Sequence, residues 1–106
     1  MNTLLAIIWL HWFSDFILQT RTMAENKSTS NKWLLSHISV YTLPFFIFGW
    51  KFAILNGVAH GCIDWCTSRL SSKMYKQNRI HNFWVVIGFD QALHMSCLIL
   101  SWGYLL

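Results

Sequence analysis

Four long apolar segments occupy most of this chain of 106 residues. They cover residues 2–20, 33–50, 52–68 and 83–106, and each is close to the roughly 20 apolar residues that an α-helix needs to cross a bilayer. Only 11% of the residues are charged, against about 25% in a typical soluble domain. The sequence therefore predicts an all-α integral membrane protein of four antiparallel transmembrane helices, in a single domain over residues 1–106.

Basic residues concentrate in the two polar loops that join these segments. The loops 21–32 and 69–82 together hold seven Lys and Arg, whereas the opposite side holds only Lys51. Because positively charged loops stay in the cytoplasm, we predict that both termini lie outside a bacterial-type inner (cytoplasmic) membrane that the chain crosses several times. The expected partner is the lipid bilayer, whose anionic head groups account for the net charge of +4. No zinc-finger spacing or basic run indicates nucleic acid, and a homo-oligomer is left open.

Local signals refine the second and third segments. Pro44 removes a backbone donor and predicts a kink near Val40. The run 49–51 separates the two segments and predicts a tight antiparallel hairpin. All three cysteines lie inside apolar segments and are interpreted as buried small apolar side chains, namely Cys62, Cys66 and Cys97.

Three of the four acidic residues lie inside the apolar segments, and each has a histidine four positions away. Residues four apart share one helix face, so three helices each present a His/Asp pair. A buried ionised Asp without a partner costs about 2.5–3.5 kcal/mol in a bilayer, and the pairs should therefore face the bundle interior. The pairs are His11 with Asp15, His60 with Asp64, and Asp90 with His94.

Further polar side chains extend these faces. Gln19 follows Asp15 by one turn, His37 and Tyr41 lie one turn apart on the second segment, and Gln91 lies beside Asp90. Counted from the predicted cytoplasmic ends at about 1.5 Å per residue, the His and Asp side chains fall into two levels. The level at roughly 6–11 Å holds Asp15, His37, Asp64 and Asp90. The level at roughly 12–17 Å holds His11, His60 and His94. This agreement among antiparallel helices predicts one shared site.

The chemistry of this set favours a divalent metal. Histidine and aspartate are ligands of zinc, iron and manganese, and four-helix bundles build dinuclear sites from such pairs. The predicted metal ligands are His11, Asp15, His60, Asp64, Asp90 and His94. His37 and Asp90 are the predicted catalytic groups, and Gln19, Tyr41 and Gln91 are predicted to orient the ligands. Proton or ion handling without a fixed metal, and a purely structural polar core, remain alternative interpretations.

Four stretches of the chain also resemble a known family. These stretches are HWFSDFILQT, NKWLLSHISVYT, NGVAHGCIDWCTSRL and IGFDQALHM. They are similar to a family of small bacterial and phage membrane proteins of unknown function, with the patterns H-x-x-x-D-F-x-L-Q, H-x-x-x-D and D-Q-x-x-H. The resemblance implies roles for His11, Asp15, Gln19, His37, His60, Asp64, Asp90, Gln91 and His94. A weaker likeness connects the chain with predicted membrane-bound metal-dependent hydrolases.

Three functions are compatible with these observations. The first is a metal-dependent hydrolase of a lipid or phosphate ester, with metals that activate water and with Arg21 and Arg69 near the cytoplasmic mouth. The second is a channel or carrier for protons or metal ions, because Asp and His often line such routes. The third is an accessory membrane subunit with a structural polar core. Residues 4–10 of the first segment carry no polar side chain, which disfavours a route through the membrane.

Overall fold

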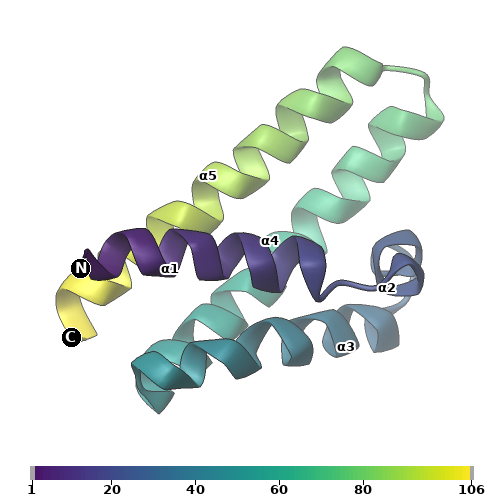
Figure 1. Cartoon of the computed structure of the whole chain (residues 1–106). Coiled ribbons are helices and arrows are strands. Elements are labelled where there is room, and N and C mark those ends of the chain that lie inside the picture. Colours follow the sequence, from purple (N-terminus) through teal and green to yellow (C-terminus); the bar gives the residue numbers. More distant parts are fainter. Residues whose placement is uncertain (1, 106) are drawn as a thin grey trace.

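The computed structural model describes residues 2–105, and every regular element in that range is helical (Figure 1). Helix α1 (Thr3–Trp12) continues into a π-helical turn, η1 (Phe13–Ile17), and a short helix α2 (Arg21–Asn26) follows. Helix α3 (Asn31–Thr42) continues into a 3-10 helix, η2 (Leu43–Phe48). The two longest helices are α4 (Trp50–Lys76) and α5 (Ile80–Leu105). The all-α prediction is thus confirmed.

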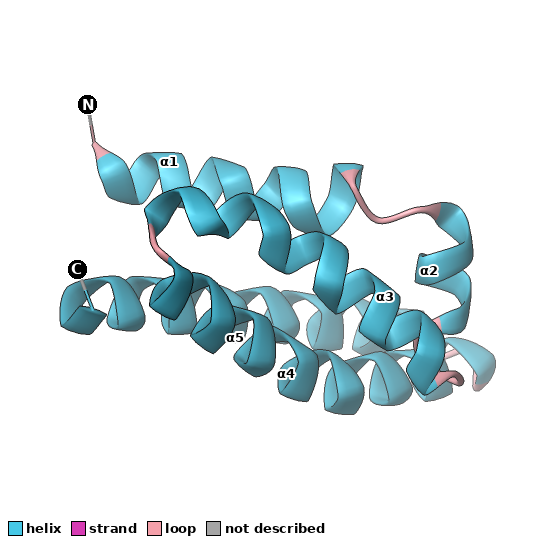
Figure 2. Cartoon of the chain, turned by 90° about the horizontal axis from the view of Figure 1, so that it is seen from below, coloured by secondary structure: helices cyan, strands magenta, loops and turns pink. Residues whose placement is uncertain are grey.

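The four long helical stretches lie side by side in an elongated bundle with extents of 43 × 26 × 20 Å (Figure 2). Helices α4 and α5 form an antiparallel pair, α3 packs on α4, and α1 crosses the pair (Figure 1). Both termini and the turn before α4 lie at one end, called here the terminal end. Helix α2 and the turn 77–79 lie at the other, called here the α2 end. The two basic loops of the sequence therefore share one end of the bundle.

Specific residues set the helix boundaries. The side chain of Asn2 caps α1 by accepting from the Leu4 backbone N–H, and that of Thr20 caps α2 by accepting from Met23. Gly49 has φ 113°, a conformation that favours glycine, and reverses the chain between η2 and α4. This confirms the predicted hairpin. The helix becomes irregular at Leu43, beside Pro44, and not at Val40 where the kink was predicted.

The predicted end of the third segment and both predicted loops differ from the structure. The third segment was predicted to end at residue 68, but α4 continues to Lys76 because no Gly or Pro interrupts residues 69–76. Lys73 and Lys76 lie in its last turn, where basic side chains favour a helix C-terminus. The predicted loop 69–82 therefore shrinks to a short turn, and the predicted loop 21–32 contains α2.

The helices themselves do not support the predicted four membrane spans. Within residues 2–105, α5 alone is long and apolar enough to cross a membrane, and Thr3–Ile17 is apolar but shorter. Helix α4 carries Lys51, Asn56 and the His60/Asp64 pair among its apolar residues, which lowers its mean hydropathy, and α3 has only 12 residues of regular helix. Length and composition alone thus show one helix of spanning character.

Apolar and polar side chains are buried at different places along the bundle. An apolar core at the terminal end comprises Ile7, Tyr41, Phe45, Phe52, Ala53 and Leu98. Polar side chains fill the middle of the bundle and its α2 end. Among the described residues, thirteen polar or charged side chains are buried but only eight apolar ones. The interior is therefore more polar than a typical protein core.

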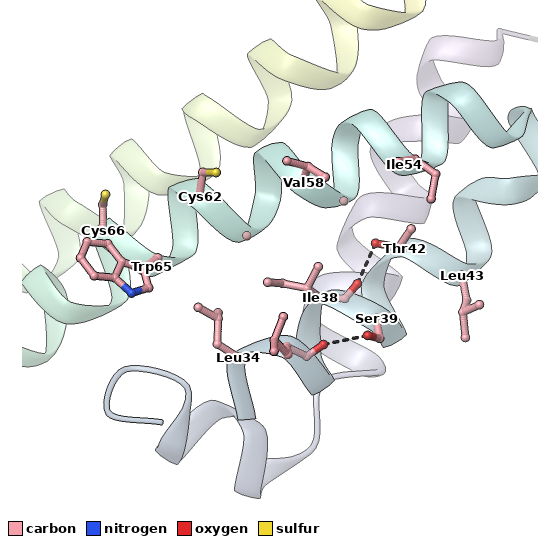
Figure 3. Close-up of a pocket in the computed structure, with 13 residues that line it drawn as sticks. Leu34, Ile38, Ser39, Thr42, Leu43, Ile54, Val58, Cys62, Trp65 and Cys66 are labelled. Atoms are coloured by element: carbon pink, nitrogen blue, oxygen red, sulfur yellow. Dashed lines mark hydrogen bonds between the residues drawn. The ribbon is translucent and has the colours of Figure 1, made fainter. Parts of the chain in front are cut away.

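Helices α3 and α4 approach closely where α4 has glycines. A Cβ atom on Gly57 would overlap the Thr42 side chain, and one on Gly61 would lie 2.6 Å from Ile38 Cδ1. An apolar groove of about 750 Å³ lies along this contact (Figure 3). Cys62 and Cys66 line it and are exposed, so the prediction that they are buried was wrong. This groove contains none of the buried His or Asp residues.

Candidate metal centre

Five helical elements bring the buried His and Asp side chains together. His11 comes from α1, Asp15 from the π-helical turn η1, His37 from α3, and the remaining pairs from α4 and α5. Each of these residues is at most 8% exposed. The π turn matters for this placement, because its extra residue per turn rotates Asp15 relative to a regular helix. All the predicted His and Asp residues therefore meet in one cluster, which we call the His/Asp cluster: His11, Asp15, His37, His60, Asp64, Asp90 and His94.

Four residues of the cluster each offer one ligand atom within 4.8 Å of the other three. His37 Nε2 lies 3.0 Å from His60 Nε2, 3.0 Å from Asp15 Oδ1 and 3.3 Å from Asp64 Oδ2. His60 Nε2 lies 3.5 Å from Asp15 Oδ1 and 3.3 Å from Asp64 Oδ2. A regular tetrahedron with edges of about 3.3 Å has its centre about 2.0 Å from each corner, which matches zinc–nitrogen and zinc–oxygen bonds. We call these four residues group 1.

A second set of ligand atoms lies beside group 1. His94 Nε2 lies 3.2 Å from Asp90 Oδ1 and 3.3 Å from Asp64 Oδ1. Asp15, Asp90 and His94 can also offer ligand atoms that lie within 4.8 Å of one another. We call Asp15, Asp90 and His94 group 2. Asp15 belongs to both groups, and Asp64 contacts both through different oxygens, so the two groups share carboxylates.

Two histidines of the cluster have Nδ1 atoms without a hydrogen-bond partner, and one of them stacks on neighbouring rings. The His60 ring stacks on Tyr41 with centroids 3.8 Å apart and on His94 with centroids 4.1 Å apart. The Nδ1 atoms of His37 and His60 have no hydrogen-bond partner among the described residues. No hydrogen bond at Nδ1 therefore fixes their tautomers, and a proton carried on Nδ1 would leave Nε2 free to face an ion.

His11 occupies a different position from the other histidines. Its Nδ1 lies 2.7 Å from the Tyr41 hydroxyl and its Nε2 lies 2.9 Å from Gln91 Oε1. Gln91 Nε2 donates in turn to Asp15 Oδ2 at 3.1 Å and to Asp90 Oδ2 at 3.0 Å. Since both nitrogens of His11 are used in this chain of hydrogen bonds, the structure places His11 among the groups that orient carboxylates. It places His37, predicted as a catalytic group, within group 1.

The residues predicted to orient the ligands have unequal positions. Tyr41 and Gln91 belong to the hydrogen-bond chain that ends on Asp15 and Asp90. Gln19 lies farther out, and its buried Oε1 atom has no partner among the described residues. Thr67 also contacts the cluster, because its hydroxyl donates to Asp90 Oδ1 at 2.5 Å. Asp90 is thus held from both sides.

Lys27 is the contact that the sequence did not reveal. Its ammonium donates to Asp64 Oδ2 at 3.1 Å, and its side chain is only 18% exposed. It follows the last residue of α2, and the fold of that short helix turns it into the bundle. Lys27 and Lys32 lie in the same basic loop, and nothing in the sequence distinguishes Lys27 from Lys32, which is exposed.

The two arginines near the predicted cytoplasmic mouth do not contact the cluster. Arg21 donates to Glu25 at 2.8 Å, and this hydrogen bond raises the pKa of Arg21 above its ordinary value. Arg69 donates to the Trp65 carbonyl and to Asn31 Oδ1, and its guanidinium lies 4.4 Å from the centre of the Trp65 ring. Arg69 is therefore held on the surface of α4.

A cleft of about 480 Å³ at the α2 end leads to the cluster. We call it the α2 cleft. Asp15, Asp90 and Gln91 form its inner end, and Lys27 lies at its side. A smaller cavity of about 50 Å³ lies between Lys27, Asp64 and Asp90. The cluster can therefore be reached from the α2 end, whereas the apolar core lies between it and the terminal end.

Comparison with known proteins assigns the chain to a family. A family described as a protein of unknown function (DUF3307) matches residues 3–105, so the chain belongs to this uncharacterised family. No curated protein matches the chain, and no solved structure matches it. The family assignment therefore agrees with the resemblance of its sequence patterns and names no reaction.

Proposed function

We propose that this chain is a four-span membrane protein whose His/Asp cluster binds two divalent metal ions and hydrolyses an ester. The observation that carries the proposal is group 1. Two imidazole nitrogens from α3 and α4 lie 3.0 Å from one another and 3.0–3.5 Å from the same two carboxylate oxygens, which come from η1 and α4. Without a cation or protons between them, lone pairs at such distances repel one another.

The donor atoms suggest which ions would fit. Two nitrogens and two oxygens in a tetrahedral arrangement suit zinc in group 1. Group 2 offers one histidine, His94, and two carboxylates, Asp15 and Asp90, of which Asp15 also belongs to group 1. Zinc, manganese and iron all accept such a set of ligands. Bridging carboxylates are expected where two metals lie roughly 3.5–4 Å apart. We therefore propose two ions, with Asp15 and Asp64 between them.

Asp90 is the residue best placed to move a proton. It lines the α2 cleft, and hydrogen bonds from Thr67 and Gln91 fix the direction of its carboxylate. Bound metals would supply an activated water and polarise the ester oxygen. Asp90 would accept a proton from the attacking water and return it to the leaving alcohol oxygen. A bond forms between the water oxygen and the carbonyl carbon or phosphorus of the ester, and the bond from that atom to the alcohol oxygen breaks.

The outer surface supports the membrane part of the proposal. Twenty-six large apolar side chains are exposed among the described residues. They occur on all four long stretches, for example Leu5, Ile47, Val58 and Leu100. Apolar surface of this extent around a polar interior is unfavourable in water but matches a lipid environment.

The basic α2 end supports an orientation with both termini outside the inner membrane. Engineered cysteines at Ser28 and Ser72 should react with an impermeant maleimide only after the membrane is opened. The parent chain is the control, because it already contains Cys62, Cys66 and Cys97. Labelling of both engineered positions in intact cells would contradict this orientation.

Elemental analysis tests the metal proposal. Protein purified in nanodiscs without added metal, and after equilibration with zinc, should contain up to two ions per chain after buffer exchange. His81→Ala is a matched control, because His81 is exposed at the start of α5 and outside both groups. It should retain the wild-type stoichiometry. Wild-type protein without bound metal under both conditions would refute the proposal.

One observation favours a second candidate, a proton pathway. The hydrogen-bond chain Tyr41–His11–Gln91 ends on two carboxylates and resembles a relay. However, the apolar core, including Phe45 and Phe52, lies beyond Tyr41 toward the terminal end. We therefore expect no proton or metal flux in sealed liposomes. Robust flux that Asp90→Asn abolishes would establish the channel or carrier instead.

A further inference from the structure

The α2 cleft has a polar wall suited to an oxyanion. Hydroxyl groups of Ser28, Ser68, Ser71 and Ser72 line it. The Ser68 hydroxyl is buried and has no hydrogen-bond partner among the described residues. Lys27 is the ammonium beside this wall. Most buried hydroxyls have a hydrogen-bond partner, so this one is available to donate to a group bound beside it.

A second cleft continues this wall to the surface of the α2 end. It has a volume of about 400 Å³ and shares Ser28 and Ser72 with the α2 cleft. Arg69, Lys73 and Lys76 line it, and no carboxylate does. An anion that approaches the cluster from the α2 end therefore passes basic and hydroxyl groups before it reaches Asp15 and Asp90. Among the described residues, one other carboxylate lines this path, that of Glu25, and it is paired with Arg21.

Binding of two divalent ions would change the net charge of the cluster from negative to positive, and this step rests on the proposed function. Without metals, three carboxylates face one ammonium, so the cleft repels anions. Two divalent ions carry one charge more than the three carboxylates, and Lys27 adds another. In that state the metals satisfy Asp64, and the Lys27 ammonium is released from its 3.1 Å contact to bind a different oxygen.

The opposite wall of the α2 cleft is apolar and aromatic. Phe16, Tyr75, Phe83 and Ile87 form it. The cleft is also far larger than one small oxyanion, since a water molecule takes about 30 Å³ in the liquid and the cleft measures about 480 Å³. The anionic group should therefore belong to a molecule with an apolar part.

We propose that the substrate is an amphiphilic phosphate ester, whose phosphate binds Lys27 and the serine wall beside the metals. Its apolar part lies against the aromatic wall. Hydrolysis forms a bond between the water oxygen and phosphorus and breaks the bond between phosphorus and the alcohol oxygen, which leaves with a proton. Water is the only co-reactant. The ester can come from a lipid phosphate or from a soluble amphiphile, and both share this chemistry.

Calorimetric titration of zinc-loaded protein with inorganic phosphate tests the binding site. Hydrogen bonds to charged groups contribute about 1.5–3 kcal/mol, so Lys27→Met should weaken phosphate binding roughly 10- to 100-fold. Lys27→Arg retains the charge and should bind phosphate within a few-fold of wild type. Lys32→Met is the matched control, because Lys32 is exposed and lines neither cleft. Metal content is measured on every sample.

The source of the phosphate is tested with nanodiscs. Release of inorganic phosphate is measured from discs that contain phosphatidate and, separately, from p-nitrophenyl phosphate added to phosphatidylcholine discs. Release from phosphatidate that depends on Lys27 supports a lipid source, and release only from the soluble ester supports a soluble one.

The outcomes separate the two proposals. If wild-type protein holds two metals but neither binds nor releases phosphate, the phosphate inference is wrong and the metal site stands. Equal phosphate binding by Lys27→Met and wild type also overturns the assignment of Lys27. If wild-type protein holds no metal, the proposed function fails and this inference fails with it.

Discussion

The two ends of the bundle interior use buried side chains differently. At the terminal end, Ile7, Phe45, Phe52 and Leu98 pack as an apolar core that needs only shape and volume. In the middle and at the α2 end, the interior is made of carboxylates, imidazoles and hydroxyls, each of which requires a partner. The apolar core therefore serves to hold the helices together. Buried ionisable groups cost stability, and the polar half is therefore the part of the interior to which we assign the proposed function.

Removing a ligand of group 1 should have the largest effect on the polar half. We expect His60→Ala and Asp64→Ala each to abolish stoichiometric zinc binding, because each removes a corner of the tetrahedron. The double variant should lose little more, since ligands of one site act as a unit. Elemental analysis after buffer exchange measures the stoichiometry. Full zinc content in either single variant would show that group 1 does not bind the ion.

A truncation in the apolar core should have the opposite profile. Phe52 is 1% exposed and packs against Phe45 and Trp102. Phe52→Ala should lower the free energy of unfolding by about 3–5 kcal/mol and leave the zinc stoichiometry of the folded protein unchanged. Denaturant titration in micelles measures the first quantity. Phe89→Ala is the control, because Phe89 is 60% exposed and should change stability little. Loss of zinc from folded Phe52→Ala would break the distinction between the two ends.

Gln91 sharpens the comparison, because it supports the site without belonging to either ligand group. Gln91→Ala removes the hydrogen bonds to Asp15 and Asp90 and leaves His11 Nε2 without its partner. Loss of such orienting contacts typically weakens metal binding about 10- to 100-fold. Competition with a zinc chelator measures this change. Gln77→Ala, in the turn between α4 and α5, should have no effect. Unchanged affinity in Gln91→Ala would show that the carboxylates are positioned without it.

Sequence reasoning anticipated the cluster because the spacing of its residues is local. A His and an Asp four residues apart share a helix face in any helix, so the pairs 11/15, 60/64 and 90/94 could be recognised in advance. The apolar surroundings then required the pairs to meet. His37 was recognised on the same grounds, although its place within group 1 depends on how α3 packs on α4.

Other parts of the site depend on tertiary structure and could not be predicted. The π-helical turn at η1 changes the direction of the Asp15 side chain, and no residue in its sequence FSDFI predicts a π-helical turn. Helix α2 lies in a polar stretch that was predicted to be a loop, and this helix brings Lys27 to Asp64. The two predicted levels of carboxylates and histidines also do not persist as separate layers, since each group mixes both residue types. Small departures from a straight helix are enough to merge them.

X-ray absorption spectroscopy at the zinc edge tests the central claim most directly, because it reports the atoms around the ion itself. Zinc-loaded protein in nanodiscs should show nitrogen and oxygen ligands at about 2.0–2.1 Å, close to four per zinc, with the outer-shell scattering of imidazole. That scattering should disappear in His60→Ala and persist in His81→Ala. Six oxygen ligands without imidazole scattering, or sulfur ligands at about 2.3 Å, would contradict a metal centre built from the His/Asp cluster.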